Sequence, residues 1–188
     1  LHPSGQIKIF TAAVAPKGIR LAAEIADGMF PIFMIPEKFE VFSDNINRGF
    51  EKSENIKNLS HFEICPIVPV SIGKDINLCR KPIKSMLALY IGGMGAVGKN
   101  FYNDYVKLLG FEQAAIDIQK LYLTGKIPQA EELVPDELVD SISLVGPREN
   151  VAERLNIWKK AAQENKVSSI LLSGGFHNQM EFIAENVL

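Results

Sequence analysis

Apolar and polar positions follow one another along the chain in the order of strand, turn and helix. A short apolar and partly β-branched run, Ile7–Ala13, ends just before Pro16. The residues after it carry apolar side chains at helical spacing, at 19, 22, 23 and 26. Proline is favoured as the first residue of a helix. We therefore predict a strand over 7–13 and a helix that begins at Pro16 and is ended by Asp27-Gly28.

The same alternation then repeats twice. The apolar runs Met29–Ile35 and Phe62–Val70 are the next predicted strands. A helical stretch follows each of them, the first opened by Pro36 and the second capped by Asp75. Pro82 is expected to break or kink the second helix, because proline lacks the N–H group that the helix needs. Three alternations of this kind are typical of βαβ units around a parallel sheet.

From Ile83 to Asp140 the apolar spacing is helical throughout, which predicts a helical insertion. A strand over Ser141–Val145, a helix after Gly146-Pro147, a last strand over Val167–Leu172 and a closing helix follow it. The predicted fold class is α/β, and residues 1–188 are interpreted as one partial domain. The number of predicted strands is about half the number in a closed (β/α)8 barrel. An open, doubly wound sheet needs fewer strands and fits the count as well.

Composition excludes several classes of protein. The chain has 188 residues, of which 47% are hydrophobic, so that a packed core is expected. The net charge of −2 is spread over interspersed charges, and no nucleic-acid partner is expected. No apolar run is long enough for a membrane span, and no leader peptide is expected. Cys65 and Cys79 are expected to be buried free thiols of a cytoplasmic protein. Since the chain begins at Leu1, it is expected to be processed or part of a longer protein.

Two segments are candidates for binding chemistry. Gly93–Gly98 matches the dinucleotide-binding fingerprint, and Asp117 follows at the distance of a ribose-binding acid. Because Asp117 falls inside a helical run, a glycine-rich joint between helices is the favoured interpretation, and a Rossmann-type NAD enzyme is the alternative. The other candidate is the turn from Thr11 to Gly18, where small residues precede a helix. It is either a phosphate cradle, aided by the charges of Lys17 and Arg20, or an ordinary strand-to-helix turn. No metal site is predicted, and no catalytic residue can be named.

Four separate segments carry a resemblance to a known family. They are IKIFTAAVAPKGIRLAAEIADG, ALYIGGMGAVGKNFYNDYVKLLGFEQAA, VPDELVDSISLVGPRENVAERL and VSSILLSGG. In this order they resemble the luciferase-like monooxygenase superfamily, in the branch of deazaflavin (coenzyme F-420)-dependent oxidoreductases related to methylenetetrahydromethanopterin reductase. The resemblance runs from about Ile7 to Leu172.

The resemblance implies the C-terminal half of a TIM-type (β/α)8 barrel, about strands five to eight, with the helical insertion at 83–140. In the family the loop after the fifth strand holds the cofactor phosphate with backbone amides. The cofactor-binding residues implied here are Ala12, Ala13, Val14, Ala15, Pro16, Lys17 and Gly18. The family places its ring-binding and proton-handling residues largely in the first half, which this chain lacks.

The reaction implied by the resemblance is hydride transfer between reduced coenzyme F-420 and an organic substrate. Relatives that use FMN instead insert one oxygen atom from molecular oxygen, acting on paired donors. The expected partners are a small-molecule substrate and the missing N-terminal half of the barrel, and a homodimer is a further option. The helical insertion would form a wall of the substrate-binding side. Besides the NAD enzyme, a second alternative is a non-catalytic orphan half-barrel that acts as a binding or assembly module.

Overall fold

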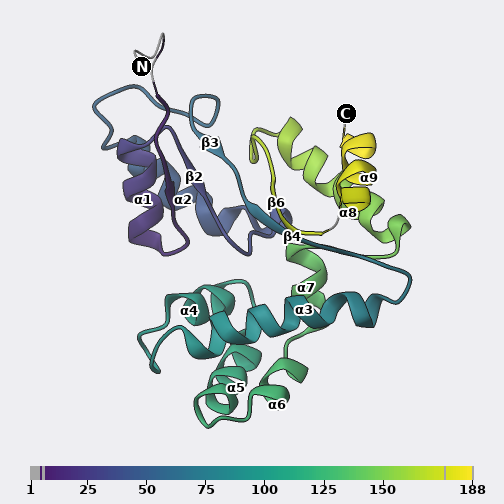
Figure 1. Ribbon diagram of the computed structural model, residues 1–188. Helices are drawn as coiled ribbons and strands as arrows, with labels where there is room; N and C mark the ends of the chain where they lie inside the picture. Colours follow the sequence, from purple (N-terminus) through teal and green to yellow (C-terminus); the bar gives the residue numbers. More distant parts are fainter. Residues whose placement is uncertain (1–4, 6, 176, 188) are drawn as a thin grey trace. The chain divides into compact units, whose positions relative to one another are not determined.

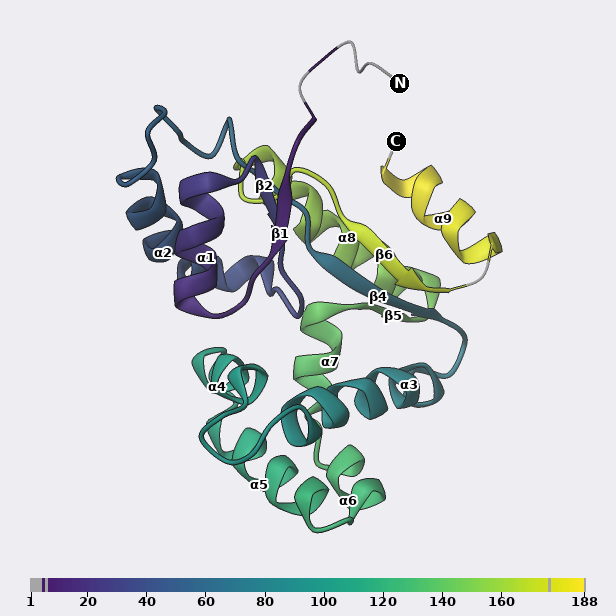
Figure 2. The ribbon, with the colours of Figure 1, turned by 60° about the vertical axis from the view of Figure 1, so that its left-hand side comes forward.

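Figures 1 and 2 show the computed structural model, which describes Gly5 and residues 7–175 and 177–187. Strands and helices alternate along this part of the chain, and the fold class is α/β, as the hydrophobic pattern predicts. The described residues divide into two compact units. The first unit holds the residues up to Ile67 and Ala161–Leu171, and the second unit holds Val68–Lys160 and the residues from Leu172 on.

The first unit is built on three parallel strands in the order β1-β2-β3. Thr11 pairs with Met29, and Met29 pairs with Ile64 on its other side. Helices α1 and α2 pack against each other beside this sheet (Figure 1). The elements are β1 (Phe10–Ala12), α1 (Pro16–Ile25), β2 (Gly28–Phe30), the 3-10 helix η1 (Pro36–Lys38), α2 (Glu40–Phe50) and β3 (Glu63–Ile64).

Helix α1 begins where the sequence predicts. Pro16 is its first residue, a position at which the fixed φ of proline is helical and its missing N–H costs nothing. Ile19, Ala22 and Ala23 lie on one face and are buried in the core of the unit. The helix ends at Ile25, just before the predicted stop. The prediction of a strand, a tight turn and a helix is therefore confirmed for this segment.

The strands of the first unit are shorter than the apolar runs that predict them. The run Phe62–Val70 is divided between β3 and β4, because Pro66 has no N–H group to donate to a ladder. Its carbonyl oxygen still accepts from the N–H of Leu171 at 2.9 Å. In the same way, β2 ends before Pro31, whose carbonyl accepts from the N–H of Ile67 at 2.9 Å.

The sheet of the second unit has the order β5-β4-β6, with β4 and β5 parallel and Val70 beside Leu144. Helix α3 lies between this sheet and helices α4 to α6 (Figures 1 and 2). The elements are β4 (Ile67–Ile72), α3 (Ile76–Ala88), the π-helix η2 (Leu89–Gly93), α4 (Phe101–Leu108), α5 (Glu112–Leu123), α6 (Ile127–Glu132), α7 (Asp136–Ile142), β5 (Leu144–Gly146), α8 (Arg148–Gln163), β6 (Leu171–Gly174) and α9 (His177–Val187).

Helix α3 starts as predicted but does not stop at its proline. The carboxylate of Asp75 accepts from the N–H groups of Asn77 at 2.9 Å and Leu78 at 3.3 Å, which confirms the predicted cap. Pro82 lies inside the helix, which continues to Ala88, so a break at Pro82 is wrong. The carbonyl that Pro82 leaves without a donor belongs to Leu78, whose side chain is 59% exposed, and water can solvate it.

Three predicted boundaries shift. Ile83 falls in the middle of α3, so the helical stretch starts at the beginning of that helix, and no strand occurs over residues 83–140. Helix α7 runs on through Ile142, which moves the strand predicted over Ser141–Val145 to β5. The strand predicted over Val167–Leu172 is found as β6, displaced toward the C-terminus.

Candidate functional site

The turn that joins β1 to α1 contains all of the residues predicted to bind a cofactor. Ala12 is exposed at the end of β1, whereas Ala13 and Val14 are buried and fix the turn to the core. Ala15 precedes the helix, and no side chain caps its N-terminus. Lys17 is exposed on the first helical turn. The structure therefore brings the predicted residues together on one short connection, at the carboxyl end of a parallel strand.

Backbone N–H groups of this turn lack acceptors within the helix. The first hydrogen bond of the helix runs from the N–H of Ile19 to the carbonyl of Ala15 at 3.0 Å. The N–H groups of Lys17 and Gly18 come before it in the chain and therefore have no acceptor within the helix. A Cβ atom added to Gly18 would meet only the Cβ of Ala13, at 3.6 Å, so no bulky side chain covers the turn there. Because the N-terminus of a helix also carries partial positive charge, this turn can hold an anionic group through its backbone.

The turn after β2 contains a strained residue that the sequence does not reveal. Phe33 has a φ of +56° and is fully buried. A bulky side chain in this conformation costs about 1–3 kcal/mol, and such positions cluster at functional sites. Since Ala12 pairs with Phe30 in parallel strands, the turns after β1 and β2 leave the same edge of the sheet. The apolar run Met29–Ile35 gives no signal that singles out Phe33.

The glycine-rich segment Gly93–Gly98 is a joint between helices. The π-helix η2 precedes it, whereas a dinucleotide-binding fingerprint needs a strand there, and Asp117 lies within α5. A Cβ atom at Gly92 would stand 2.4 Å from the Cβ of Tyr122. Glycine therefore lets α5 approach η2 closely. The prediction of a joint is confirmed, and the Rossmann-type alternative is not favoured.

Two buried asparagines hold this joint in place. The side-chain amide of Asn100 donates to the carbonyls of Tyr90 at 2.9 Å and Ile91 at 3.0 Å. The amide of Asn103 donates to the carbonyls of Ile91 at 3.1 Å and Ala115 at 2.7 Å. These bonds satisfy carbonyls of the π-helix and join it to α4 and α5. The side-chain amides of Asn100 and Asn103 thus stabilise the structure of the joint.

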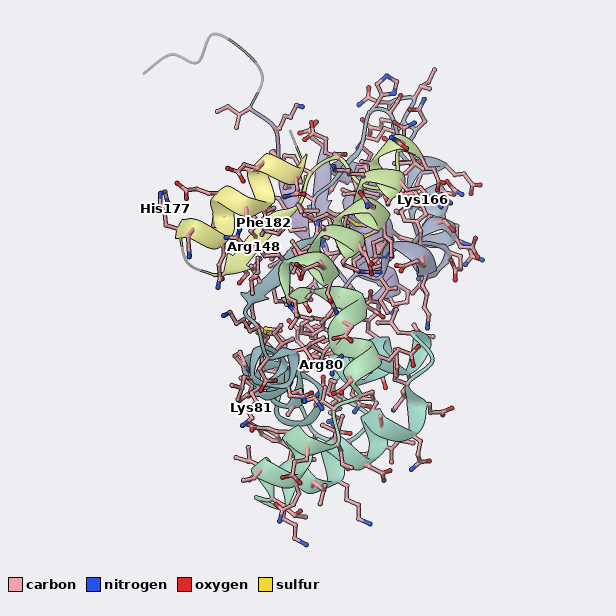
Figure 3. The ribbon with its side chains drawn as sticks, turned by 90° about the vertical axis from the view of Figure 1, so that its right-hand side faces the viewer. Arg80, Lys81, Arg148, Lys166, His177 and Phe182 are labelled. Carbon is pink, nitrogen blue, oxygen red and sulfur yellow. The ribbon has the colours of Figure 1, made fainter. Side chains whose placement is uncertain are left out.

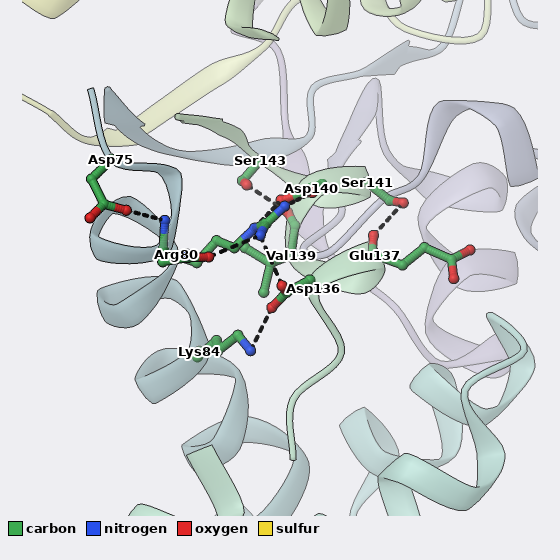
Figure 4. Close-up of polar contacts among 10 residues, drawn as sticks. Asp75, Arg80, Lys84, Asp136, Glu137, Val139, Asp140, Ser141 and Ser143 are labelled. Atoms are coloured by element: carbon green, nitrogen blue, oxygen red, sulfur yellow. Dashed lines mark hydrogen bonds and ion pairs between the residues drawn. The ribbon is translucent and has the colours of Figure 1, made fainter. Parts of the chain in front are cut away.

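Charged side chains connect α3 to α7 (Figure 4). Arg80 binds both carboxylate oxygens of Asp140, one of them at 2.9 Å, and also binds Asp136 at 2.8 Å. Lys84 binds the second oxygen of Asp136 at 2.6 Å. The hydrogen bond from Lys84 and the charge of Arg80 lower the pKa of Asp136, and the hydrogen bond to Asp140 raises the pKa of Arg80. The lowered pKa of Asp136 favours its charged form, which suits a structural network.

One histidine and the two cysteines have surface or structural positions. His177 is 91% exposed on its side chain and pairs with Glu181 at 3.2 Å. Cys65 and Cys79 are free and buried, as predicted. Among the residues that the structure describes, no group of His, Cys, Asp and Glu is arranged to hold a metal ion. Within the same residues, every helix is too short or too polar to cross a membrane.

Comparison with known proteins relates these features to a family. The family model described as luciferase-like monooxygenase matches residues 1–164. The chain belongs to the luciferase-like monooxygenase family. A protein of Mycobacterium tuberculosis named as a coenzyme F-420-dependent oxidoreductase is 34% identical over 184 residues, which cover 97% of this chain and 52% of that protein. The 5,10-methylenetetrahydromethanopterin reductase of Archaeoglobus fulgidus is 24% identical over 189 residues, which cover 98% and 54%.

Two solved structures of F-420-dependent enzymes share the fold. The coenzyme F-420-dependent tetrahydromethanopterin reductase of Methanopyrus kandleri has a TM-score of 0.65 at 21% identity, over 94% of this chain and 48% of that one. An F-420-dependent secondary alcohol dehydrogenase has a TM-score of 0.59 at 15% identity, over 99% and 50%. The chain spans about half the length of the curated relatives it matches. The resemblance inferred from four segments is confirmed.

Proposed function

We propose that this chain is the C-terminal half, about strands five to eight, of a (β/α)8 barrel that transfers hydride between reduced coenzyme F-420 and an organic substrate. Two relatives named for F-420 chemistry or methylenetetrahydromethanopterin reduction match nearly all of the chain, and this supports the proposal. The observation that carries it is the turn between β1 and α1. This turn lies at the carboxyl end of a parallel strand, which is the side of a barrel where active sites lie.

The residues of this turn fit the anionic end of such a cofactor. The N–H groups of Lys17 and Gly18 would donate to phosphate oxygens, and the side chain of Lys17 would add a full charge. Ala12 and Ala15 leave room for the group, and Pro16 shapes the turn without donating. When bound, the reduced deazaflavin supplies the hydride. The chain's own contribution is to bind and orient the phosphate from a rigid turn that Ala13 and Val14 anchor in the core.

An open sheet edge in the first unit supports the proposal that another half of the barrel pairs with this chain. Strand β1 lies at the edge of its sheet. Ile7 and Ile9, which precede it, are 71% and 63% exposed, and Leu21 and Ile25 on α1 are 53% and 65% exposed. Unpaired strand edges and exposed apolar side chains favour association with another chain segment. The N-terminal half of the barrel is the partner that we propose for this edge, and a second copy of the chain in a homodimer is the other candidate.

FMN-dependent monooxygenation, acting on paired donors with molecular oxygen, is a second candidate function. The description of the matching family model as a luciferase-like monooxygenase favours it. A turn that recognises phosphate through backbone amides would accept FMN as well as coenzyme F-420. In either case the substrate is a small organic molecule, and the insertion over 83–140 would form a wall of the substrate-binding side.

The test compares substitutions in the turn, in the chain co-expressed with an N-terminal half from a relative. Ala13→Glu would force a charged side chain into a buried position beside Gly18. It should weaken F-420 binding strongly, measured by fluorescence quenching, because it displaces the turn and adds negative charge near the phosphate. Lys17→Ala should cost only about 1 kcal/mol, because the lysine is exposed and the backbone does most of the binding.

Ala12→Glu separates binding from folding, since Ala12 is exposed and tolerates a larger side chain. It should also weaken the cofactor, while thermal unfolding stays unchanged. Lys52→Ala, at an exposed lysine outside the turn, serves as the control for Lys17→Ala. Unchanged F-420 affinity in both glutamate variants would place the phosphate elsewhere. A parallel titration with FMN decides between the two candidate functions.

A further inference from the structure

A cavity of about 320 Å³ lies in the second unit, at the carboxyl ends of strands β4 and β5. Ile72, the last residue of β4, pairs with Gly146, the last residue of β5, and the N–H of Gly73 donates to the carbonyl of Gly146 at 3.0 Å. The two chain segments that leave these strands therefore begin side by side and line the cavity. Its volume is at the small end of the range for ligand sites, about 300–1,000 Å³.

The charges around this cavity are mostly positive. Lys74, from the segment after β4, and Arg148, from the segment after β5, both line it, against one acid, Glu149. In the part of the chain that the structure describes, neither Lys74 nor Arg148 forms an ion pair, whereas Arg80 and Lys84 on the neighbouring helix α3 are neutralised by carboxylates. Two cations from different segments thus line one cavity together with a single acid, and among the described residues neither cation is within ion-pair distance of a carboxylate.

The cavity has a fixed wall on the side of α9. The guanidinium carbon of Arg148 lies 4.9 Å from the ring centre of Phe182, and Figure 3 shows the two side chains next to each other. A guanidinium group stacked on an aromatic face keeps its N–H edge available for an oxyanion. The side chain of Gln179 donates to the carbonyl of Ile72 at 2.8 Å, which holds the start of α9 against the end of β4. Arg148 is therefore oriented before any ligand arrives.

We propose that this cavity is an anion-binding subsite, built from other residues than the turn after β1, which takes a carboxylate or phosphate group between Arg148 and Lys74. Arg148 would bind two oxygens of the group through its planar fork, and Lys74 would act as a point charge. Only the source of the anion depends on the proposed function. The anion is either an acidic group of the cofactor or part of an anionic substrate.

Inorganic phosphate is the first probe, added to the chain while backbone amide signals are followed by NMR. The amide signals of Gly73 and Arg148 should shift and saturate. Arg148→Gln, which removes the charge and keeps a polar side chain, should raise the apparent Kd about tenfold, as expected for the loss of a charge-assisted bidentate contact. Lys74→Met should raise it by a smaller factor. Lys159→Gln removes an exposed cation of α8 outside the cavity and should leave the Kd unchanged.

An absence of saturable shifts, or an unchanged Kd in both Arg148→Gln and Lys74→Met, would overturn the proposal. Both side chains are exposed, and circular dichroism should confirm that the variants stay folded. Competition then identifies the source of the anion. Displacement of phosphate by coenzyme F-420, lost in Arg148→Gln, indicates the cofactor, whereas phosphate that stays bound indicates the substrate. The turn that carries the proposed function is tested separately. Unchanged F-420 affinity in both Ala12→Glu and Ala13→Glu would contradict its role, and neither residue lines this cavity.

Discussion

The side-chain nitrogen of Lys57 lies 2.7 Å from the carbonyl oxygen of Ala26, just beyond the end of α1. It also donates to the carbonyls of Ala23 at 3.2 Å and Glu24 at 3.1 Å. Helix α1 has no basic residue in its own last turn, so this distant lysine supplies the cation that the helix C-terminus favours. Because the candidate cofactor turn opens the same helix, Lys57 helps to fix the element that carries this turn.

Replacing Lys57 by Met should lower the free energy of unfolding by about 1–2 kcal/mol, because three carbonyls lose a charged donor. Urea unfolding followed by circular dichroism measures the change. Lys52→Met is the matched control, since Lys52 is exposed in the same region, and should change the free energy by less than about 0.5 kcal/mol. Equal effects of the two substitutions would contradict the capping role.

Adding a methyl group at Gly92 should destabilise the joint between α3 and α4. The new Cβ would stand 2.4 Å from the Cβ of Tyr122, and overpacking of this kind costs about 1–3 kcal/mol. Gly18→Ala is the control, since its Cβ meets only an ordinary contact at 3.6 Å, and should be neutral or stabilising. Thermal unfolding compares the two. Tyr122→Gly removes the Cβ that the new methyl group would meet. If the effects of Gly92→Ala and Tyr122→Gly simply add in the double variant, the steric explanation is wrong.

The network around Asp136 should make stability depend on pH in acid. Lys84 and Arg80 lower the pKa of Asp136 in the folded chain, so the unfolded chain binds a proton more readily. The stability that this group adds is present above about pH 4 and is lost as the pH falls through its folded pKa. Asp136→Asn should therefore flatten the fall in unfolding free energy on acidification, measured by urea unfolding at several pH values. Glu132→Gln, at an exposed acid on α6, should leave the slope as it is.

The chain alone should not turn over substrate. If it forms half of a barrel, it lacks half of the active-site loops and leaves β1 unpaired. Oxidation of reduced F-420, followed by absorbance, should appear only when an N-terminal half is supplied. Steady cofactor oxidation by the monodisperse chain without such a half would refute this prediction.

Local signals in the sequence predicted the elements that local chemistry decides. Pro16 and Asp75 mark the first residue of α1 and the cap of α3, because proline geometry and an aspartate cap act on the adjacent helical turn. Gly93–Gly98 was correctly interpreted as a joint, since Asp117 falls on a helical period. The candidate site residues 12–18 could be placed on one turn for the same reason.

Long-range contacts account for what the sequence could not predict. Lys57 stands 31 positions after Ala26 in a polar link, and nothing near it indicates that it caps a helix. The strain at Phe33 comes from its positive φ, which the surrounding apolar run does not specify. The cavity between Lys74 and Arg148 exists because β4 and β5 pair, although their residues are far apart in the chain.

The ion pair between Arg80 and Asp140 joins residues 60 positions apart, at the two ends of the helical stretch. Once these ends are tied, the entropy lost in closing the segment between them grows slowly with its length, by about 0.6 kcal/mol for each doubling. Helices α4, α5 and α6 can therefore be lengthened, shortened or replaced during evolution at little cost to the sheet. Descendants of one ancestral gene would be expected to diverge most in this stretch while they keep the arginine and the aspartate.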